Sequence, residues 1–149
     1  DVVIFGSKFD LFKFVGTYSA NLDCVAKDIY LLEEANKKVF YVGPKQFGFN
    51  MNWLTRISPQ NRILATNKLL DKTIFLEKKL SSVVPKKNYL SILNPILIKS
   101  KIPITDSHGR LISPDRTHLT KQGAQYLGKK VLDHKAFLEA LQMPKNIFK

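Results

Sequence analysis

Two short apolar stretches decide the fold, Val2-Val3-Ile4-Phe5-Gly6 and Lys38-Val39-Phe40-Tyr41-Val42-Gly43. Unbroken runs of branched and aromatic residues that end at a glycine are typical of strands buried on both faces. Between them, apolar residues recur at helical spacing over residues 21–36, with Ser19 or Asn21 available as the N-cap. A strand, a helix and a second strand with these lengths predict a βαβ unit, and therefore a parallel sheet.

The rest of the chain continues this alternation. The pattern predicts a loop over 44–60, a helix from about Pro59 to Leu80, a strand over 89–93, a small hairpin over 102–112 and a helix from about Thr120 to Leu141. We therefore expect one α/β domain over residues 1–149, a three-layer α/β/α architecture around a parallel, flavodoxin-like sheet. In such sheets, ligands bind beyond the carboxyl ends of the strands.

Composition narrows the possible functions. The 149 residues include 24 lysines and arginines against 12 acidic residues, a formal charge of +12. An apolar fraction of 44% excludes general disorder. The single cysteine, Cys24, excludes an intrachain disulfide, and we expect it to be buried in the first helix. No stretch is long and apolar enough for a membrane span. The chain opens on a buried-looking strand without an initiator methionine, so we expect it to be cut from something longer.

The net charge invites a nucleic-acid interpretation, but the distribution of the basic residues does not favour it. The basic residues are mostly scattered lysine pairs, and only four are arginines. Recognition of bases and phosphates favours arginine, so a solvated, lysine-rich surface is a better interpretation than a nucleic-acid site. Attraction to an anionic membrane surface or to an acidic polysaccharide lies between these two interpretations.

The segment that carries chemistry is Ser113-Pro114-Asp115-Arg116-Thr117-His118-Leu119-Thr120. Asp115 and His118 are three residues apart in a loop before a helix that Thr120 caps. The carboxylate can reach the imidazole, hold its Nδ1–H tautomer and leave Nε2 free to accept a proton from a nucleophile. Gly123 allows close backbone approach in the first turn of the helix. The alternative is that Asp115 and Thr120 are turn and cap residues and that His118 is incidental.

The run Asp115-x-x-His118-Leu119-Thr120-x-x-Gly123-Ala124 resembles the last conserved block of the SGNH hydrolases, the GDSL-like esterases and acetyltransferases. It looks most like the SGNH domains that work with membrane acyltransferases to O-acetylate surface polysaccharides. Residues 94–112 and 38–44 are similar to the hairpin and mid-domain strand of those domains. The resemblance implies a Ser-His-Asp triad, an acylated glycan or acyl donor as substrate, a membrane acyltransferase domain or subunit as partner, and a periplasmic or extracytoplasmic location.

The resemblance leaves the nucleophile open. Asp1 to Lys8 looks like the third block of the family, in which Gly6 and Lys8 would serve the oxyanion or substrate site, with Lys8 at the usual asparagine position. The Gly-Asp-Ser block is absent, so we expect the nucleophile upstream of Asp1 and the chain to be the C-terminal portion of the domain. The rival interpretation makes Ser7 the nucleophile. If nothing lies upstream, the chain by itself is expected to be inactive.

Two classes of function follow, acyl transfer or ester hydrolysis on a cell-surface glycan, and a non-catalytic basic α/β module that binds a glycan, a membrane surface or nucleic acid. We expect no cofactor, and three histidines without i, i+4 pairing predict no metal site. His108 is expected to be a turn residue and His134 to lie on the exposed side of the last helix. The loop aromatics Phe47, Phe49 and Trp53 either line an acyl or sugar pocket or pack on the core.

Overall fold

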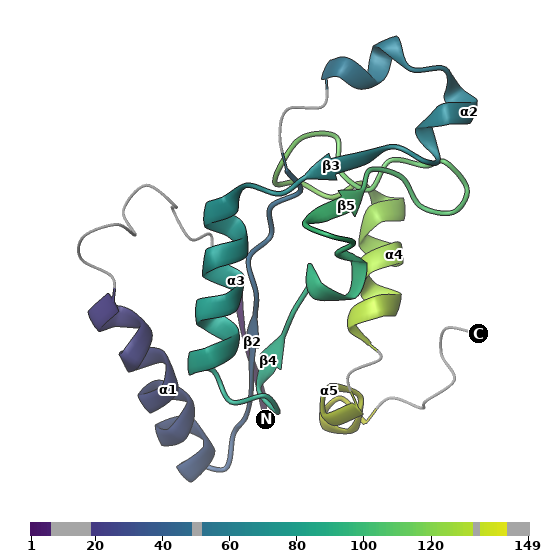
Figure 1. Ribbon diagram of the computed structural model, residues 1–149. Coiled ribbons are helices and arrows are strands. Elements are labelled where there is room, and N and C mark those ends of the chain that lie inside the picture. Colours follow the sequence, from purple (N-terminus) through teal and green to yellow (C-terminus); the bar gives the residue numbers. More distant parts are fainter. Residues whose placement is uncertain (7–18, 49–51, 133–134, 143–149) are drawn as a thin grey trace.

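The computed structural model describes residues 1–6, 19–48, 52–132 and 135–142 (Figure 1). Its centre is a parallel sheet of three strands in the order β1-β2-β4: β1 (Val2–Gly6), β2 (Lys38–Val42) and β4 (Tyr89–Leu90). Helix α1 (Ser19–Glu34) lies between β1 and β2 in the chain, and the two strands pair from Val2↔Lys38 to Gly6↔Val42. The predicted βαβ unit, parallel sheet and α/β class are therefore confirmed.

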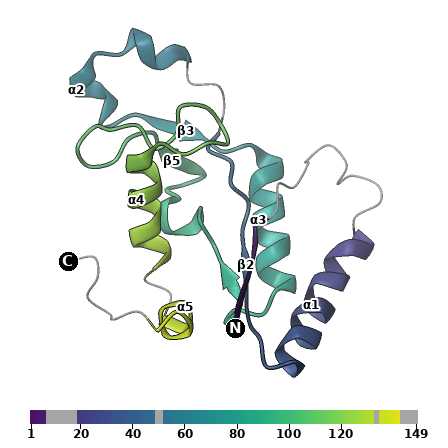
Figure 2. The same cartoon turned by 180° about the vertical axis from the view of Figure 1, so that it is seen from behind.

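The two faces of β2 are buried against different helices. Val39 and Tyr41 pack into a cluster with α1 and with α3 (Asp71–Val83). Phe40 belongs to a second cluster, in which Phe137 of α5 (Lys135–Ala140) meets its ring edge to face at 5.0 Å. Both views of the ribbon place α1 and α3 on one side of the strands and α5 on the other (Figures 1 and 2).

A second, antiparallel sheet lies beyond the carboxyl end of the first. It pairs β3 (Thr66–Lys68) with β5 (Lys101–Pro103), and the short helices η1 (Asn52–Arg56) and α2 (Pro59–Arg62) lie beside it (Figure 1). The turn η2 (Asn94–Ile96) leads from β4 toward β5, and α4 (Lys121–Val131) packs against η2.

The prediction of one helix from Pro59 to Leu80 is wrong. Three elements occupy that stretch: α2, β3 and α3. Leu64, expected on the apolar face, is 84% exposed, while Asn67 is 5% exposed and lies in β3, paired with Ile102. A strand partner 35 residues away in sequence overrode the local helical spacing, because ladder hydrogen bonds and burial outweigh propensity in so short a segment.

The prediction of one helix from Thr120 to Leu141 is also wrong, because α4 ends at Val131 and α5 begins at Lys135. The break lets Leu127 pack in the cluster around Ile112 while Phe137 packs against the sheet at Phe40. One straight helix has one apolar stripe, which cannot serve two separate cores. The third strand is shorter than predicted, Tyr89–Leu90. Of the hairpin predicted over 102–112, residues 102–103 belong to β5 and residues 104–112 form a small hairpin closed by a Thr105↔Leu111 bridge.

Cys24 corrects a further prediction, because it is exposed on α1. The apolar stripe of that helix passes through Val25 and Ile29, and Cys24 lies off it. None of the helices in the described ranges is long and apolar enough to cross a membrane.

Candidate active site

Asp115 and His118 form a hydrogen-bonded pair in the loop before α4. The imidazole Nδ1 lies 2.6 Å from Asp115 Oδ2, which is the contact that the D-x-x-H spacing predicts. The carboxylate therefore favours the tautomer that carries its proton on Nδ1 and directs the basic lone pair to Nε2. The structure thus brings the two predicted site residues together, and their catalytic role stays a prediction.

The same carboxylate also shapes the loop that carries the histidine. Asp115 Oδ1 accepts hydrogen bonds from the backbone N–H of Thr117 at 2.7 Å and of His118 at 2.8 Å. These two backbone donors, followed by the imidazole, hold the pKa of the Asp115 carboxyl well below its usual range. Asp115 is thus a turn residue that also contacts the imidazole.

Buried contacts hold the dyad loop, which we define as residues 113–119. Ser113 is 1% exposed, and its hydroxyl lies 2.7 Å from the carbonyl oxygen of Asp115 and 2.5 Å from that of His118. Ser113 was not predicted from the sequence to hold the loop. Its position could have indicated this role, because a serine side chain often forms a hydrogen bond with the backbone of the residue two positions later.

The first turn of α4 fixes the other end of the dyad loop. Thr120 Oγ1 accepts from the Gly123 N–H at 2.8 Å, which confirms the predicted N-cap. A Cβ on Gly123 would sit 1.9 Å from the carbonyl oxygen of Ile112, so only glycine fits this backbone approach. The predicted roles of Thr120 and Gly123 in holding the loop are therefore both realised.

A second loop ties the dyad to the carboxyl end of the parallel sheet. It follows β2 and spans residues 43–48, and we call it the β2 loop. Its Phe47 N–H donates to the carbonyl oxygen of Arg116 at 2.8 Å, and its Phe47 carbonyl accepts from Asn67 Nδ2 at 3.1 Å. The dyad thus lies at the end of the sheet where α/β proteins place their chemistry.

The histidine is open to solvent. Its side chain is 77% exposed and that of Asp115 is 49% exposed, and no described residue forms a hydrogen bond with His118 Nε2. Gly6 is the last residue of β1, at the same end of the sheet as the β2 loop. Ser7 and Lys8, the rival nucleophile and the predicted oxyanion residue, lie outside the described residues.

The remaining sequence candidates take structural roles where they are described. His108 is exposed in the turn of the hairpin, where its N–H donates to the buried Asp106 carboxylate at 2.9 Å. Phe47 is 2% exposed inside the core, and Trp53 packs half-buried beside Leu54. His134 and Phe49 lie outside the described residues.

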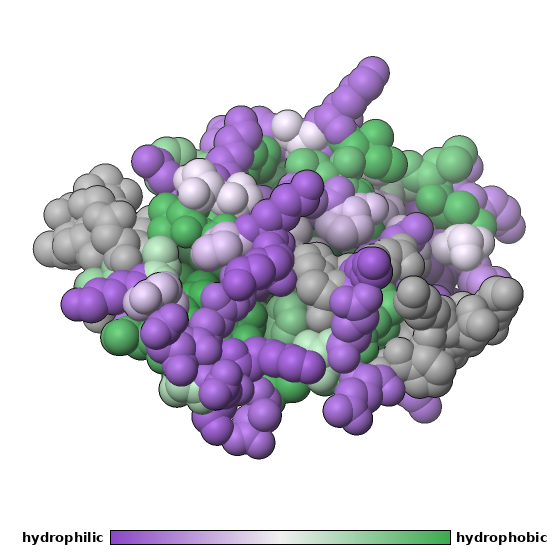
Figure 3. All heavy atoms as spheres, turned by 90° about the horizontal axis from the view of Figure 1, so that it is seen from below, coloured by the Kyte–Doolittle hydropathy of each residue, from purple (hydrophilic) through white to green (hydrophobic). Residues whose placement is uncertain are grey.

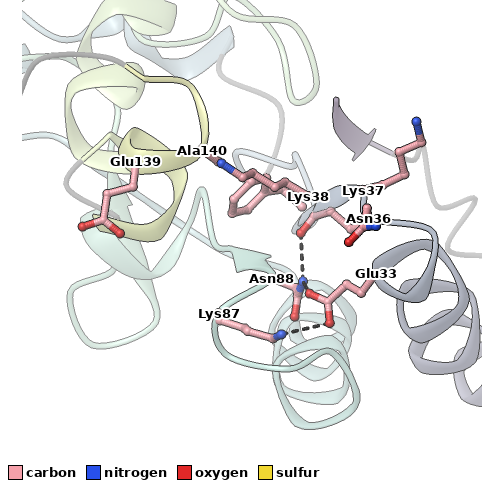
Figure 4. A pocket seen from close by; sticks show the side chains of 10 residues that line it. Glu33, Asn36, Lys37, Lys38, Lys87, Asn88, Glu139 and Ala140 are labelled. Carbon is pink, nitrogen blue, oxygen red and sulfur yellow. Dashed lines mark hydrogen bonds and ion pairs between the residues drawn. The ribbon is translucent and has the colours of Figure 1, made fainter.

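A pocket of about 490 Å³ opens at the opposite end of the strands. Hydrophilic side chains run across this face (Figure 3), and Figure 4 shows the pocket wall that Glu33, Lys87 and Asn88 form. Glu33 accepts from Asn88 Nδ2 at 2.8 Å and from Lys87 Nζ at 2.9 Å, and these bonds lower its pKa. A carboxylate satisfied in this way is a poor proton acceptor, so the pocket is a weaker candidate than the dyad for acid–base chemistry.

Within the described part of the chain, no group of three or more histidine, cysteine, aspartate or glutamate side chains could hold a metal ion.

Comparisons with family models, with curated protein sequences and with solved structures found no significant match to this chain.

Proposed function

We propose that this chain carries the acid–base part of an SGNH-type O-acyltransferase or esterase, in which Asp115 orients His118 and a serine upstream of Asp1 is the nucleophile. Under this proposal, residues 1–149 are the C-terminal portion of a three-layer α/β/α domain that acts on an acylated surface glycan. The periplasmic or extracytoplasmic location and the membrane acyltransferase partner are part of the proposal and rest on the sequence resemblance alone.

The observation that carries the proposal is the 2.6 Å contact between His118 Nδ1 and Asp115 Oδ2, with Nε2 directed away from the carboxylate. The outer edge of β1 gives further support. In the described residues β1 pairs only with β2, so a further strand that carries the nucleophile has an edge to which it can bind.

The chemistry divides into two displacements at the acyl carbon. His118 Nε2 accepts the proton of the serine hydroxyl as the serine oxygen attacks, and then gives that proton to the leaving alcohol oxygen. In the second step, Nε2 accepts a proton from water or from a glycan hydroxyl as that oxygen attacks the acyl-serine, and then gives the proton to the leaving serine oxygen. In both steps Asp115 stabilises the imidazolium through Nδ1–H.

The test uses a polypeptide that includes the residues encoded upstream of Asp1, with para-nitrophenyl acetate as the substrate. We expect His118→Ala to lower kcat by roughly a thousandfold, because both proton transfers lose their acceptor. His108→Ala is the matched control and should leave kcat unchanged. Activity that survives His118→Ala would show that the dyad assignment is wrong. Ser7→Ala separates the two nucleophile hypotheses, because it abolishes turnover only if Ser7 attacks.

The second candidate is a non-catalytic basic module that binds an anionic partner. The observation that favours it is the charge of +12, together with an exposed imidazole whose Nε2 forms no hydrogen bond with a described residue. Under this alternative, the extended polypeptide would bind polyanions with a strong dependence on salt and would show no His118-dependent hydrolysis.

A further inference from the structure

The arginines of the chain, and an excess of basic over acidic side chains, gather in one region of the molecule. Residues 52–68 and 98–120, which we call the basic lobe, contain seven basic side chains and two aspartates. The basic members are Arg56, Arg62, Lys68, Lys99, Lys101, Arg110 and Arg116. All four arginines of the chain fall in this lobe, whereas the described glutamates lie on α1, α3 and α5.

The two aspartates of the basic lobe differ in their partners, because Asp106 forms an ion pair with Arg110 and Asp115 keeps its charge beside the imidazole. Asp106 is 5% exposed and accepts from Arg110 Nε at 2.8 Å, and Asp115 pairs with His118. Arg56 and Arg116 are exposed and have no ion pair with a described residue. With seven basic side chains against two aspartates, the lobe carries a formal charge of 7 − 2 = +5.

The basic lobe is one continuous body at one end of the molecule. Ile104 N–H donates to the Ala65 carbonyl at 3.2 Å, and Thr105 Oγ1 donates to the Arg62 carbonyl at 3.2 Å, so the hairpin lies against α2 and β3. Leu54 and Ile104 share a buried cluster that joins η1 to the same body. Figures 1 and 2 place this lobe at the end away from α5 and the N-terminus.

The basic lobe also carries exposed large apolar side chains, and all of these are aliphatic. Leu64 is 84% exposed, Ile98 62%, Ile63 47% and Leu111 39%. Ile63 and Leu64 follow α2 directly, and Ile63 lies beside the hairpin turn at Gly109. Aromatic faces are the usual platforms for bases. Exposed aliphatic groups beside arginines instead suit a lipid bilayer with anionic headgroups, in which the aliphatic groups enter the acyl boundary.

We propose that the basic lobe docks on an anionic membrane surface, with Ile63 and Leu64 inserted and Arg56 and Arg116 on lipid phosphates. The dyad loop is part of this lobe, so docking places His118 at the lipid interface. The inference does not depend on catalysis by His118, because it rests on the charge and exposure of the lobe.

Vesicle flotation tests the proposal, with phosphatidylcholine vesicles that contain or lack phosphatidylglycerol at about 0.1 M salt. We expect binding only to the anionic vesicles. Arg56→Gln together with Arg116→Gln should weaken binding roughly fivefold for each charge removed. Lys78→Gln together with Lys79→Gln, on α3 outside the lobe, removes the same charge and should have a much smaller effect.

The aliphatic contribution is tested by Ile63→Ser together with Leu64→Ser, which should weaken vesicle binding about tenfold or more. Leu31→Ser, at a 54% exposed position on α1, is the matched control. Equal losses from the lobe and control variants would overturn the proposal. So would unchanged vesicle binding in the serine variant, or tight binding to heparin or RNA without binding to vesicles. All these variants are at surface positions and should fold normally. Thermal melting verifies this for each of them.

Discussion

At the scale of single residues, Glu77 is a buried carboxyl group whose ionisation should influence stability. It is 5% exposed, and Ser91 donates to one of its carboxylate oxygens. The other oxygen and the Tyr89 hydroxyl are buried without a well-formed hydrogen bond to a described residue, beside Gly43. Burial raises the pKa of the Glu77 carboxyl, and the hydrogen bond from Ser91 offsets only part of this effect.

The pH dependence of stability should reveal this group. Because the folded chain holds the Glu77 proton more tightly than the unfolded chain, its contribution is fully present below the ordinary glutamate pKa of about 4.3 and is lost as pH rises through the raised value. Glu77→Gln should therefore raise the free energy of unfolding at neutral pH and leave it nearly unchanged near pH 4. Urea unfolding across this range measures the difference.

Glu33 is the matched control, because its shift has the opposite sign. Hydrogen bonds from Asn88 and then Lys87 lower its pKa, so its contribution is present above the ordinary value and is lost as pH falls through the lowered one. Glu33→Gln should therefore destabilise the protein at neutral pH. Both variants moving stability in the same direction would contradict the assigned environments.

The pKa of Asp115 can distinguish the effect of its backbone N–H partners from that of the imidazole. Two backbone N–H groups contribute most to its lowered pKa, and the imidazole contributes less. His118→Ala should therefore leave the Asp115 pKa still below the ordinary aspartate value, as measured from its carboxyl ¹³C shift. A full return to the ordinary value would show that the backbone contacts of the dyad loop are not formed in solution.

At the scale of secondary-structure elements, the start of α4 decides where the dyad loop lies. Thr120 caps the helix, and its hydroxyl also donates to the Leu111 carbonyl oxygen, which joins the helix to the hairpin. Gly123 sits directly against Ile112, itself 1% exposed. Cap, glycine and buried isoleucine together fix the loop from its C-terminal side.

Two glycines of α4 give a matched pair of substitutions. Gly123→Ala should lower the free energy of unfolding by about 3 kcal/mol, because the new methyl group meets backbone atoms that cannot move away. Gly128→Ala meets nothing within 4 Å and should raise it by about 0.5–1 kcal/mol through helix propensity. Urea unfolding measures both, and equal effects would mean that α4 does not approach Ile112 in solution.

At the scale of the whole molecule, β1 is an edge strand of the parallel sheet formed by the described residues. Its residues, VVIFG, include no charge and no proline, and Ile4 and Phe5 are 51% and 38% exposed. Unprotected apolar edges recruit further strands, either from the same protein or from another copy. The edge of β1 is therefore a site at which a second copy of the chain can add a strand.

Self-association of the 149-residue chain should fall when this edge is charged. Ile4→Lys should lower the light scattering of concentrated samples, because an exposed lysine on an edge opposes strand addition. Ile98→Lys, at a 62% exposed position outside the sheet, adds the same charge and should have little effect. An equal decrease in both variants would point to net charge and not to the edge of β1.

The local sequence was sufficient to predict features that depend on residues close together in the chain. The apolar runs at residues 2–6 and 38–42 predicted β1 and β2, and the spacing of Asp115, His118, Thr120 and Gly123 predicted their contacts. Each of these features depends on residues within a few positions of one another, so backbone geometry alone relates them.

The tertiary structure decided the features that depend on distant partners. β3 exists because it pairs with β5, Glu77 is buried because α3 lies over the sheet, and the break between α4 and α5 serves two separate cores. The gathering of all four arginines in one lobe likewise follows from the packing of the hairpin on α2. The sequence by itself therefore determined the parallel strand pair and the dyad, because short-range geometry controls them. Only the tertiary structure decided where the middle helices break and which charges share a face, because long-range pairing and burial outweigh local preference.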